Sequence, residues 1–194
     1  MALLWNYPMI ELTLFSNTRN NKKVRAELMN NSKDDTVDYV VTWAEVHRDT
    51  KLLGRKLIRI GAWKGIIAIT RGGLIPAAII AREMDIRNID TICIATYDEK
   101  NMGEVNMIKT PEKACGEKGD GWLMIDDLVD TGTTIKAARQ LLPRCHIATV
   151  YAKEMGRPSV DTFVHEVPQN YWVFFPWDTD VQYVAPLHKS NKDV

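Results

Sequence analysis

Residues 122–134 read Trp-Leu-Met-Ile-Asp-Asp-Leu-Val-Asp-Thr-Gly-Thr-Thr, and this stretch decides the expected fold. The apolar residues 122–125 predict a buried strand. The glycine and hydroxyl residues after them predict a turn, and the apolar positions from 135 to 142 recur at helical spacing. A strand that passes through such a turn into a helix is the unit of a parallel α/β sheet. Ligands bind beyond the carboxyl ends of its strands.

The residues of this turn suit a phosphorylated sugar. Four of them would open the helix: Thr131, Gly132, Thr133 and Thr134. The free N–H groups and the positive dipole end of a helix attract a phosphate group, and threonine hydroxyls add donors. Asp126 and Asp127 are expected where the strand ends, where carboxylates can accept hydrogen bonds from sugar hydroxyls or face a metal-bound diphosphate. Asp130 follows one turn later.

A second strand and turn agree with the first. Residues 64–70 predict another buried strand, and an apolar helix is expected over 74–84. Between them, Gly72 and Gly73 allow a ligand to approach the backbone closely, and Arg71 offers a charged fork to a diphosphate. Two loops of this kind at one edge of a sheet predict a single shared site.

Strands expected at about 65–70, 90–97, 121–126 and 145–151 alternate with helices near 74–84 and 133–142. Thr42 and Glu45 have capping-box spacing at the start of an earlier amphipathic helix that should pack on the sheet. This alternation predicts an α/β protein with a mostly parallel sheet.

The two loops together resemble the signature of the type I phosphoribosyltransferases. From about Tyr39 to Leu187 the chain is similar to the bacterial xanthine-guanine phosphoribosyltransferases. The matching motifs lie at 39–43, 63–68, 71–74, 90–94, 125–132, 156–158 and 176–178. The resemblance implies the type I phosphoribosyltransferase fold, a mostly parallel sheet flanked by helices, with a flexible lid loop at about 98–121 and a small C-terminal hood at about 153–187.

The activity that the resemblance implies is purine salvage. Guanine, xanthine or hypoxanthine would react with 5-phospho-α-D-ribose 1-diphosphate (PRPP) and Mg²⁺ to give the nucleoside monophosphate and diphosphate. Asp126 and Asp127 would hold the ribose hydroxyls, with Asp127 also contacting the metal, and Asp130 would take part in proton transfer near purine N7. Arg71 and Gly72 would bind pyrophosphate, with a cis peptide between them.

On the base side, the resemblance implies that Trp172 stacks on the purine and that Val173 and Asp178 contribute contacts. Lys153 ends a strand expected from Cys145. An ammonium has three donors and no acceptor, so it favours a 6-oxo group over a 6-amino group. Trp43, Trp63 and Trp122 are expected in the core, and none of the four histidines shows spacing that indicates chemistry.

The expected lid departs from the family. The stretch 98–121 is too long for a simple connector, and such a loop can exclude water from a reaction centre. Where the relatives carry a lid arginine that reaches the pyrophosphate, this chain has Gly103. Lys100 and Lys109 are the nearest candidates to replace that charge.

The amino-acid composition limits the kinds of ligand, metal site and cellular compartment that fit this chain. Of the 194 residues, 25 are Lys or Arg and 25 are Asp or Glu, so no overall charge attracts nucleic acid. Three cysteines without metal spacing indicate neither a disulfide framework nor a zinc site and fit a reducing cytoplasm. Residues 1–35 are expected to be a flexible extension of a phosphoribosyltransferase domain at 36–194, with Met29 as an alternative start. The resemblance implies a homotetramer, with possible weak peripheral association with the inner membrane.

Two alternatives remain at this stage. One is a PRPP-sensing regulator of the same fold, although no basic stripe supports nucleic-acid binding. The other is a relative that uses hypoxanthine, adenine or a pyrimidine. Lys153 argues against adenine, and Trp172 with the Pro176–Asp178 motif favours the xanthine-guanine branch.

Overall fold

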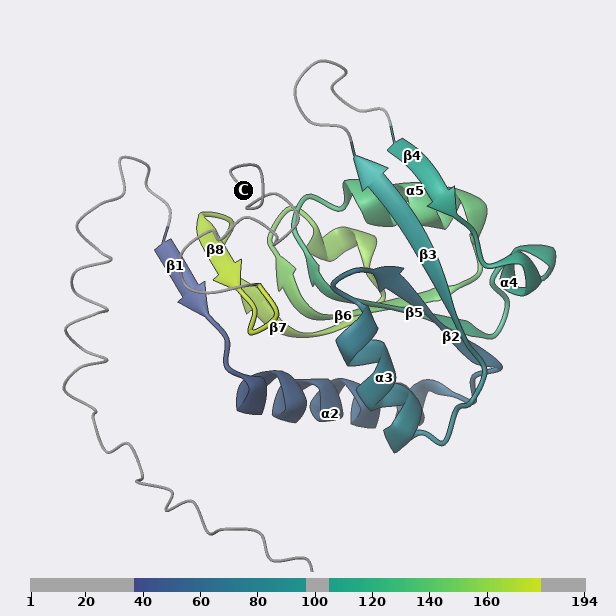
Figure 1. Cartoon of the computed structure of the whole chain (residues 1–194), viewed down its shortest axis with the longest axis horizontal. Helices are drawn as coiled ribbons and strands as arrows, with labels where there is room; N and C mark the ends of the chain where they lie inside the picture. The colour runs from purple at the N-terminus through teal and green to yellow at the C-terminus, as the bar shows by residue number, and fades with distance from the viewer. Residues whose placement is uncertain (1–36, 97–104, 179–194) are drawn as a thin grey trace, which may run out of the picture. The chain divides into compact units, whose positions relative to one another are not determined.

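The computed structural model describes residues 37–96 and 105–178, and its centre is a six-stranded sheet with the order β4-β3-β2-β5-β6-β7 (Figure 1). All neighbouring strands are parallel except β3 and β4. The strands are β2 (Gly65–Thr70), β3 (Ile89–Thr96), β4 (Val105–Lys109), β5 (Trp122–Val129), β6 (His146–Lys153) and β7 (Thr162–Val167). A separate two-stranded sheet joins β1 (Val37–Val40) to β8 (Tyr171–Phe174). The expected α/β fold with a mostly parallel sheet is confirmed.

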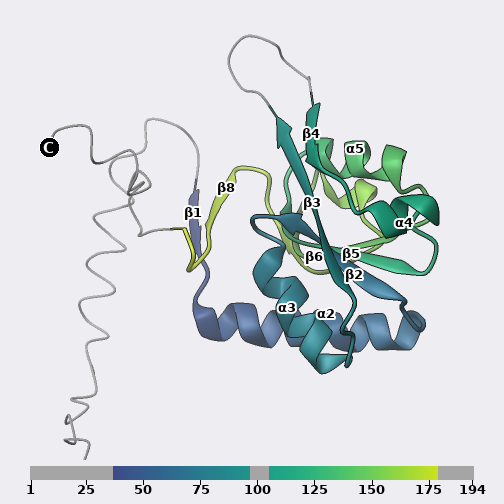
Figure 2. The ribbon, with the colours of Figure 1, turned by 45° about the vertical axis from the view of Figure 1, so that its right-hand side comes forward.

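Helices cover both faces of the central sheet (Figures 1 and 2). On one face lie α2 (Trp43–Ile60) and α3 (Leu74–Glu83), and on the other lie α4 (Glu112–Gly116) and α5 (Thr133–Leu141). The capping box is confirmed, because Thr42 Oγ1 accepts from the Glu45 N–H while the Glu45 carboxylate accepts from the Thr42 N–H. A single-turn 3₁₀ helix, η1 (Arg157–Ser159), follows β6.

The two central strands are apolar on both sides because helices cover both faces. Ile66 and Ile125 belong to the core against α2 and α3, whereas Ile67 and Met124 belong to the core against α5. All four side chains are fully buried, and burial of such a side chain stabilises the fold by about 1.5–3 kcal/mol. The cores therefore fix where the carboxyl ends of β2 and β5 lie.

The chain leaves β2 and β5 in opposite directions. After β2 it passes through α3 to β3 on one side, and after β5 it passes through α5 to β6 on the other. The pairing of β2 with β5 ends at Ala68 and Ile125, but β5 continues to Val129. The gap between the two strand ends is the topological switch point, where open α/β sheets bind ligands.

Two sequence predictions about the bounds of these elements were wrong. Strand β5 does not end at the two acids, because Asp126, Leu128 and Val129 still pair with β6. The stretch expected as a lid is regular from residue 105, since β4 pairs with β3 and α4 buries Ala114 in the core. Residues 98–104 lie outside the described part of the chain.

The stretch expected as a hood, about 153–187, contains strands of both sheets. Strand β7 lies within it and extends the central sheet beside β6, while β8 pairs with β1. Trp122 is buried, as predicted, and Trp63 packs against the core. Trp43, predicted to be in the core, is 55% exposed; it is the first residue of α2 and makes an edge-type ring contact with Trp177.

Candidate active site

The acidic pair of β5 lies at the switch point, with Asp126 buried and Asp127 half-buried. Asp126 is 9% exposed, and its Oδ1 accepts from the Asp127 N–H at 3.0 Å. Asp127 Oδ1 accepts from the Leu128 N–H at 2.6 Å. Burial, and then the adjacent charge of Asp127, raises the pKa of Asp126 well above its usual range. Burial also raises the pKa of Asp127 to about 6, to which the charge of Asp178 contributes. The pair is thus poised to gain from a cation or a hydroxyl donor.

The loop after β2 lies directly against this pair. A β-carbon at Gly72 would overlap the Asp127 carboxylate, and one at Gly73 would overlap the Ile125 carbonyl, so only glycine fits at either position. The predicted meeting of the two loops is confirmed. The cis peptide is between Thr70 and Arg71, not between Arg71 and Gly72 as expected. The chain turns directly after Thr70, where the Gly73 N–H donates to the Ile69 carbonyl at 2.9 Å.

The turn after β5 has the geometry of an anion-binding loop. Gly132 has φ +81°, a left-handed conformation that favours glycine, and α5 begins at Thr133. Thr131 Oγ1 and Thr133 Oγ1 are 3.0 Å apart and share a hydrogen bond at the mouth of the helix. Thr134 is half-buried in the first turn. The four predicted phosphate-loop residues therefore surround one helix N-terminus.

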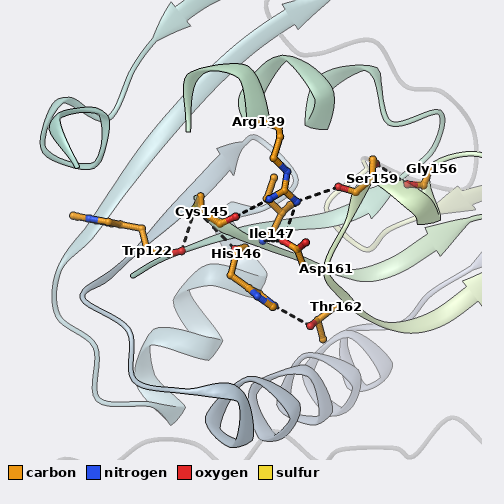
Figure 3. A network of polar contacts seen from close by, with 9 residues as sticks. All are labelled: Trp122, Arg139, Cys145, His146, Ile147, Gly156, Ser159, Asp161 and Thr162. Carbon is orange, nitrogen blue, oxygen red and sulfur yellow. Dashed lines mark hydrogen bonds and ion pairs between the residues drawn. The ribbon is translucent and has the colours of Figure 1, made fainter. Parts of the chain in front are cut away.

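A network of polar contacts joins Arg139 of α5 to the segment that holds Ser159 and Asp161 (Figure 3). Ser159 Oγ donates to the Gly156 carbonyl at 2.6 Å, and a β-carbon at Gly132 would lie only 2.7 Å from Ser159 Oγ. Arg139 of α5 donates to the Ser159 carbonyl and to Asp161 Oδ2, at 3.4 and 2.8 Å. The Gly-Arg-Pro motif at 156–158 is one of the motifs shared with the family, but the sequence assigns it no function. In the structure its turn packs against the loop at 131–134.

The third acid, Asp130, meets the predicted base-side lysine. Lys153 Nζ donates to Asp130 Oδ2 at 3.0 Å, and Lys153 is only 5% exposed. Gln169 Nε2 donates to the other oxygen, Oδ1, at 2.6 Å. The sequence gave Gln169 no role, because a single glutamine in a turn carries no pattern.

The other base-side residues come from β8 and the segment after it. Trp172 is 57% exposed, Val173 is buried, and Asp178 Oδ2 accepts from the Phe175 N–H at 2.9 Å. Trp177 stacks on Phe175, with ring centroids 4.8 Å apart. Trp172 is therefore an exposed aromatic side chain, whereas Trp177 packs against Phe175.

The interpretation of Lys109 as a lid charge is wrong. Its Nζ donates to Asp90 Oδ1 at 2.5 Å and to the Thr91 carbonyl at 2.9 Å. Those partners lie at the amino end of β3, whereas the site lies at the carboxyl ends of the strands. Lys100 and Gly103 lie outside the described residues.

A divalent metal fits the donor set in one way. Within residues 37–96 and 105–178 no group of three or more His, Cys, Asp or Glu side chains is arranged to hold a metal. Mg²⁺ is usually bound through one or two carboxylates together with substrate oxygens, which requires no such group. Asp127, whose pKa is raised, is a carboxylate that a cation would stabilise.

Comparisons with known proteins agree with this geometry. The family model described as the phosphoribosyl transferase domain matches residues 32–184. The xanthine-guanine phosphoribosyltransferase of Nitratidesulfovibrio vulgaris (strain DP4) is 54% identical over 150 residues, which are 77% of this chain and 90% of that one. The protein of that name from Desulfotalea psychrophila is 55% identical and is covered to 91%, again over 77% of this chain.

The fold comparison gives the same result. The crystal structure of the purine phosphoribosyltransferase from Pyrococcus horikoshii superposes with a TM-score of 0.63 at 23% identity, over 79% of this chain and all of that one. At that identity the likeness concerns the fold alone. Together with the family match and the close relatives, it shows that the chain belongs to the phosphoribosyltransferase family.

Proposed function

We propose that the protein is a purine salvage enzyme that converts guanine or xanthine, and also hypoxanthine, to the nucleoside 5′-monophosphate with PRPP as the sugar donor. The observation that carries the proposal is the contact of Gly72 with Asp127 at the switch point, beside the Asp130–Lys153 pair. These residues would then serve as the diphosphate loop, the sugar-binding acid pair and the base-side cation. Relatives more than 50% identical bear the name xanthine-guanine phosphoribosyltransferase.

The sugar phosphate would be held from two sides. The N–H groups at the start of α5 and the hydroxyls of Thr131 and Thr133 suit the 5′-phosphate, and the Arg71–Gly72 backbone suits the diphosphate. Asp126 and Asp127 would accept hydrogen bonds from the ribose hydroxyls. Asp127 would also hold Mg²⁺, which when bound would neutralise the leaving diphosphate.

The reaction joins two reactants that the site must orient. The bond from purine N9 to C1′ forms as the bond from C1′ to the diphosphate oxygen breaks, and the base loses one ring proton. Asp130 is the carboxylate on the base side and would accept that proton or hydrogen-bond to N7. Lys153 has donors to spare beyond Asp130 and would donate to the 6-oxo group, while Trp172 would stack on the ring.

Assembly and location belong to the same proposal. Exposed apolar side chains gather at β1 and the start of α2, on Tyr39, Val40 and Trp43, and a homotetramer would cover such side chains. Three free thiols fit the reducing cytoplasm. None of the described helices has the length and apolarity to cross a membrane. Light scattering of the purified protein tests the tetramer, and sedimentation with vesicles tests weak peripheral binding.

The test of the function is a panel of bases. Guanine, xanthine, hypoxanthine and adenine are each incubated with PRPP and Mg²⁺, and nucleotide and diphosphate are both measured. The 6-oxopurines should give equal amounts of the two products, and adenine should be essentially inert because its 6-amino group cannot accept from Lys153. Adenine turnover comparable to that of guanine would overturn the assignment.

A further inference from the structure

We infer that Gln169 is a positioning residue for the reaction, which holds the Asp130 carboxylate in place when Lys153 donates to the base. Gln169 lies in the turn between β7 and β8, and its side chain bridges two parts of the base side. Its Nε2 donates to Asp130 Oδ1 at 2.6 Å, and its Oε1 accepts from the Met155 N–H at 3.1 Å. The inference rests on the proposed function.

These two contacts fix the orientation of the amide. A backbone N–H can only donate and an ionised carboxylate can only accept, so the oxygen of Gln169 must face Met155 and the nitrogen must face Asp130. A flipped amide would lose both hydrogen bonds. The side chain is therefore a directed donor toward Asp130.

The sheet brings Gln169 to this place. Val167, at the end of β7, pairs with Lys153 at the end of β6, and the Tyr171 N–H donates to the Pro168 carbonyl at 3.1 Å to close the turn. Gln169 is thus anchored beside the residues that follow Lys153. An anchored donor can hold a carboxylate with little loss of side-chain freedom on binding.

Lys153 alone could not hold the Asp130 carboxylate in position while it also donates to the base. Lys153 is the charged partner of Asp130 at 3.0 Å, and the proposed function asks the same ammonium to meet the 6-oxo group. If it were the sole partner, Asp130 would follow the lysine or pull it from the base. A neutral amide on the other carboxylate oxygen keeps Asp130 in place without adding a charge that competes for Lys153.

Positioning of Asp130 is separate from binding of PRPP, which Asp126, Asp127 and Gly72 would bind. Loss of Gln169 should therefore lower kcat and leave the KM for PRPP nearly unchanged. One charge-assisted hydrogen bond corresponds to a loss of about 10-fold to 100-fold in rate.

The experiment compares three variants with the parent, using guanine, PRPP and Mg²⁺ between about pH 5.5 and 8.5. Gln169→Leu keeps the size but removes the donor, and should lower kcat by that factor at every pH. Gln169→Glu places a second carboxylate beside Asp130, and regains a donor only when protonated. Its kcat relative to the parent should therefore rise as the pH falls. Gln140→Leu, at an exposed position of α5, is the matched control and should behave like the parent.

The outcomes separate the inference from the proposed function. If the parent itself does not form nucleotide, the proposed function fails. If the parent is active but Gln169→Leu matches it in kcat, or if its main defect is a raised KM for PRPP, the positioning role is wrong. A Gln169→Glu to parent ratio that does not change with pH, in protein whose thermal unfolding matches the parent, would also overturn it.

Discussion

Two carboxylate sites, one on helix α2 and one on strand β5, differ in which groups supply their hydrogen-bond donors. Asp49 of α2 is 2% exposed and has partners from three elements. Its oxygens accept from Arg48 Nε and from the Tyr151 hydroxyl, both at 2.8 Å, and lie 3.2 Å from His165 Nε2. Burial raises the pKa of Asp49, but the hydrogen bonds from Arg48 and Tyr151 outweigh it, so that the pKa is lowered.

In the pair Asp126–Asp127, the first carboxylate is buried and the second half-buried, and the hydrogen-bond donors come from different groups. In the described part of the chain, the two side chains accept from the N–H groups of Asp127 and Leu128 and share a hydrogen bond with each other, and no ion pair reaches them. Their pKa values are raised by burial. A desolvated carboxylate whose hydrogen-bond donors come from the protein stabilises the fold. A desolvated carboxylate pair with too few donors costs stability, and it is expected to receive donors from a ligand.

The strongest test of this contrast is the double change Asp126→Asn and Asp127→Asn. Amides keep the shape but cannot bind a cation as a carboxylate does, and they present N–H groups where acceptors are needed. We expect turnover to fall by about 10²–10³-fold, the range for loss of one electrostatically stabilising group at a reacting centre. Calorimetry should show weaker PRPP binding in the presence of Mg²⁺.

Asp130→Asn is the matched control for that experiment. Asp130 lies on the base side, in contact with Lys153 and Gln169, so its loss should slow the chemical step and leave PRPP binding close to that of the parent. Equal losses of PRPP binding in the two proteins would contradict this division of roles.

Asp49→Ala should affect the fold rather than the chemistry. Removal of this carboxylate strands the buried Tyr151 hydroxyl and leaves Arg48 without its partner, which should lower the free energy of unfolding by about 2–4 kcal/mol. Denaturant unfolding measures the loss, and kcat per folded molecule should stay near the parent value. A stable protein with impaired kcat would mean that Asp49 serves the reaction.

The two sites should also respond to pH with opposite signs. For Asp127 the folded-state pKa is raised to about 6 from an ordinary 3.8, so its contribution is fully present below about pH 4 and is lost as the pH rises through 6. Asp127→Asn should therefore be more stable than the ligand-free parent at pH 7–8, on the order of 1–3 kcal/mol, and equal to it near pH 4.

For Asp49 the folded-state pKa is lowered, so its stability is present above its ordinary pKa and is lost as the pH falls through the folded value. Asp49→Asn should be less stable than the parent at pH 7, and the gap should narrow below about pH 4. Unfolding curves at several pH values test both signs. If the free energy of unfolding of Asp127→Asn and of the parent changed with pH in the same way, the ionised form of Asp127 would not be destabilised by burial.

The sequence was most informative where the motif and the elements coincide. The apolar runs of β2 and β5 and the two glycine loops predicted both strands, both turns and their meeting. The ends of the strands were less predictable. Asp126 and Leu128 continue to pair with β6. The sequence does not reveal this extension, because two adjacent acidic residues usually indicate that a strand has ended. β4 was hidden because Val105–Lys109 lies in a polar stretch and is strand only through its antiparallel partner β3.

Contacts between distant residues were beyond sequence reasoning. Gln169 and Asp130 are 39 positions apart, and nothing in the local pattern of either predicts their hydrogen bond. The same holds for Asp49 and Tyr151, 102 positions apart. His165, to which no chemistry was assigned, owes its place beside Asp49 to β7 joining the central sheet. Such pairs are set by tertiary packing, which a single sequence does not encode in a readable motif.

The smallest expected effect belongs to Lys109, and it tests whether that lysine serves the site at all. Its ion pair with Asp90 is near the surface, with the two side chains 48% and 32% exposed, so Lys109→Ala should cost at most about 1 kcal/mol of unfolding free energy. In the antiparallel pairing β4 begins at Val105, opposite Thr96 at the carboxyl end of β3 where PRPP would bind, and runs away from that end to Lys109, opposite Cys93. Steady-state kinetics should therefore give a KM for PRPP within about twofold of the parent, the size of a screened charge at a distance. Lys100→Ala, measured in parallel, tests the remaining prediction that Lys100 compensates for the arginine absent at Gly103. A KM for PRPP that rises tenfold in Lys109→Ala would show that this lysine leaves Asp90 and reaches the diphosphate during turnover.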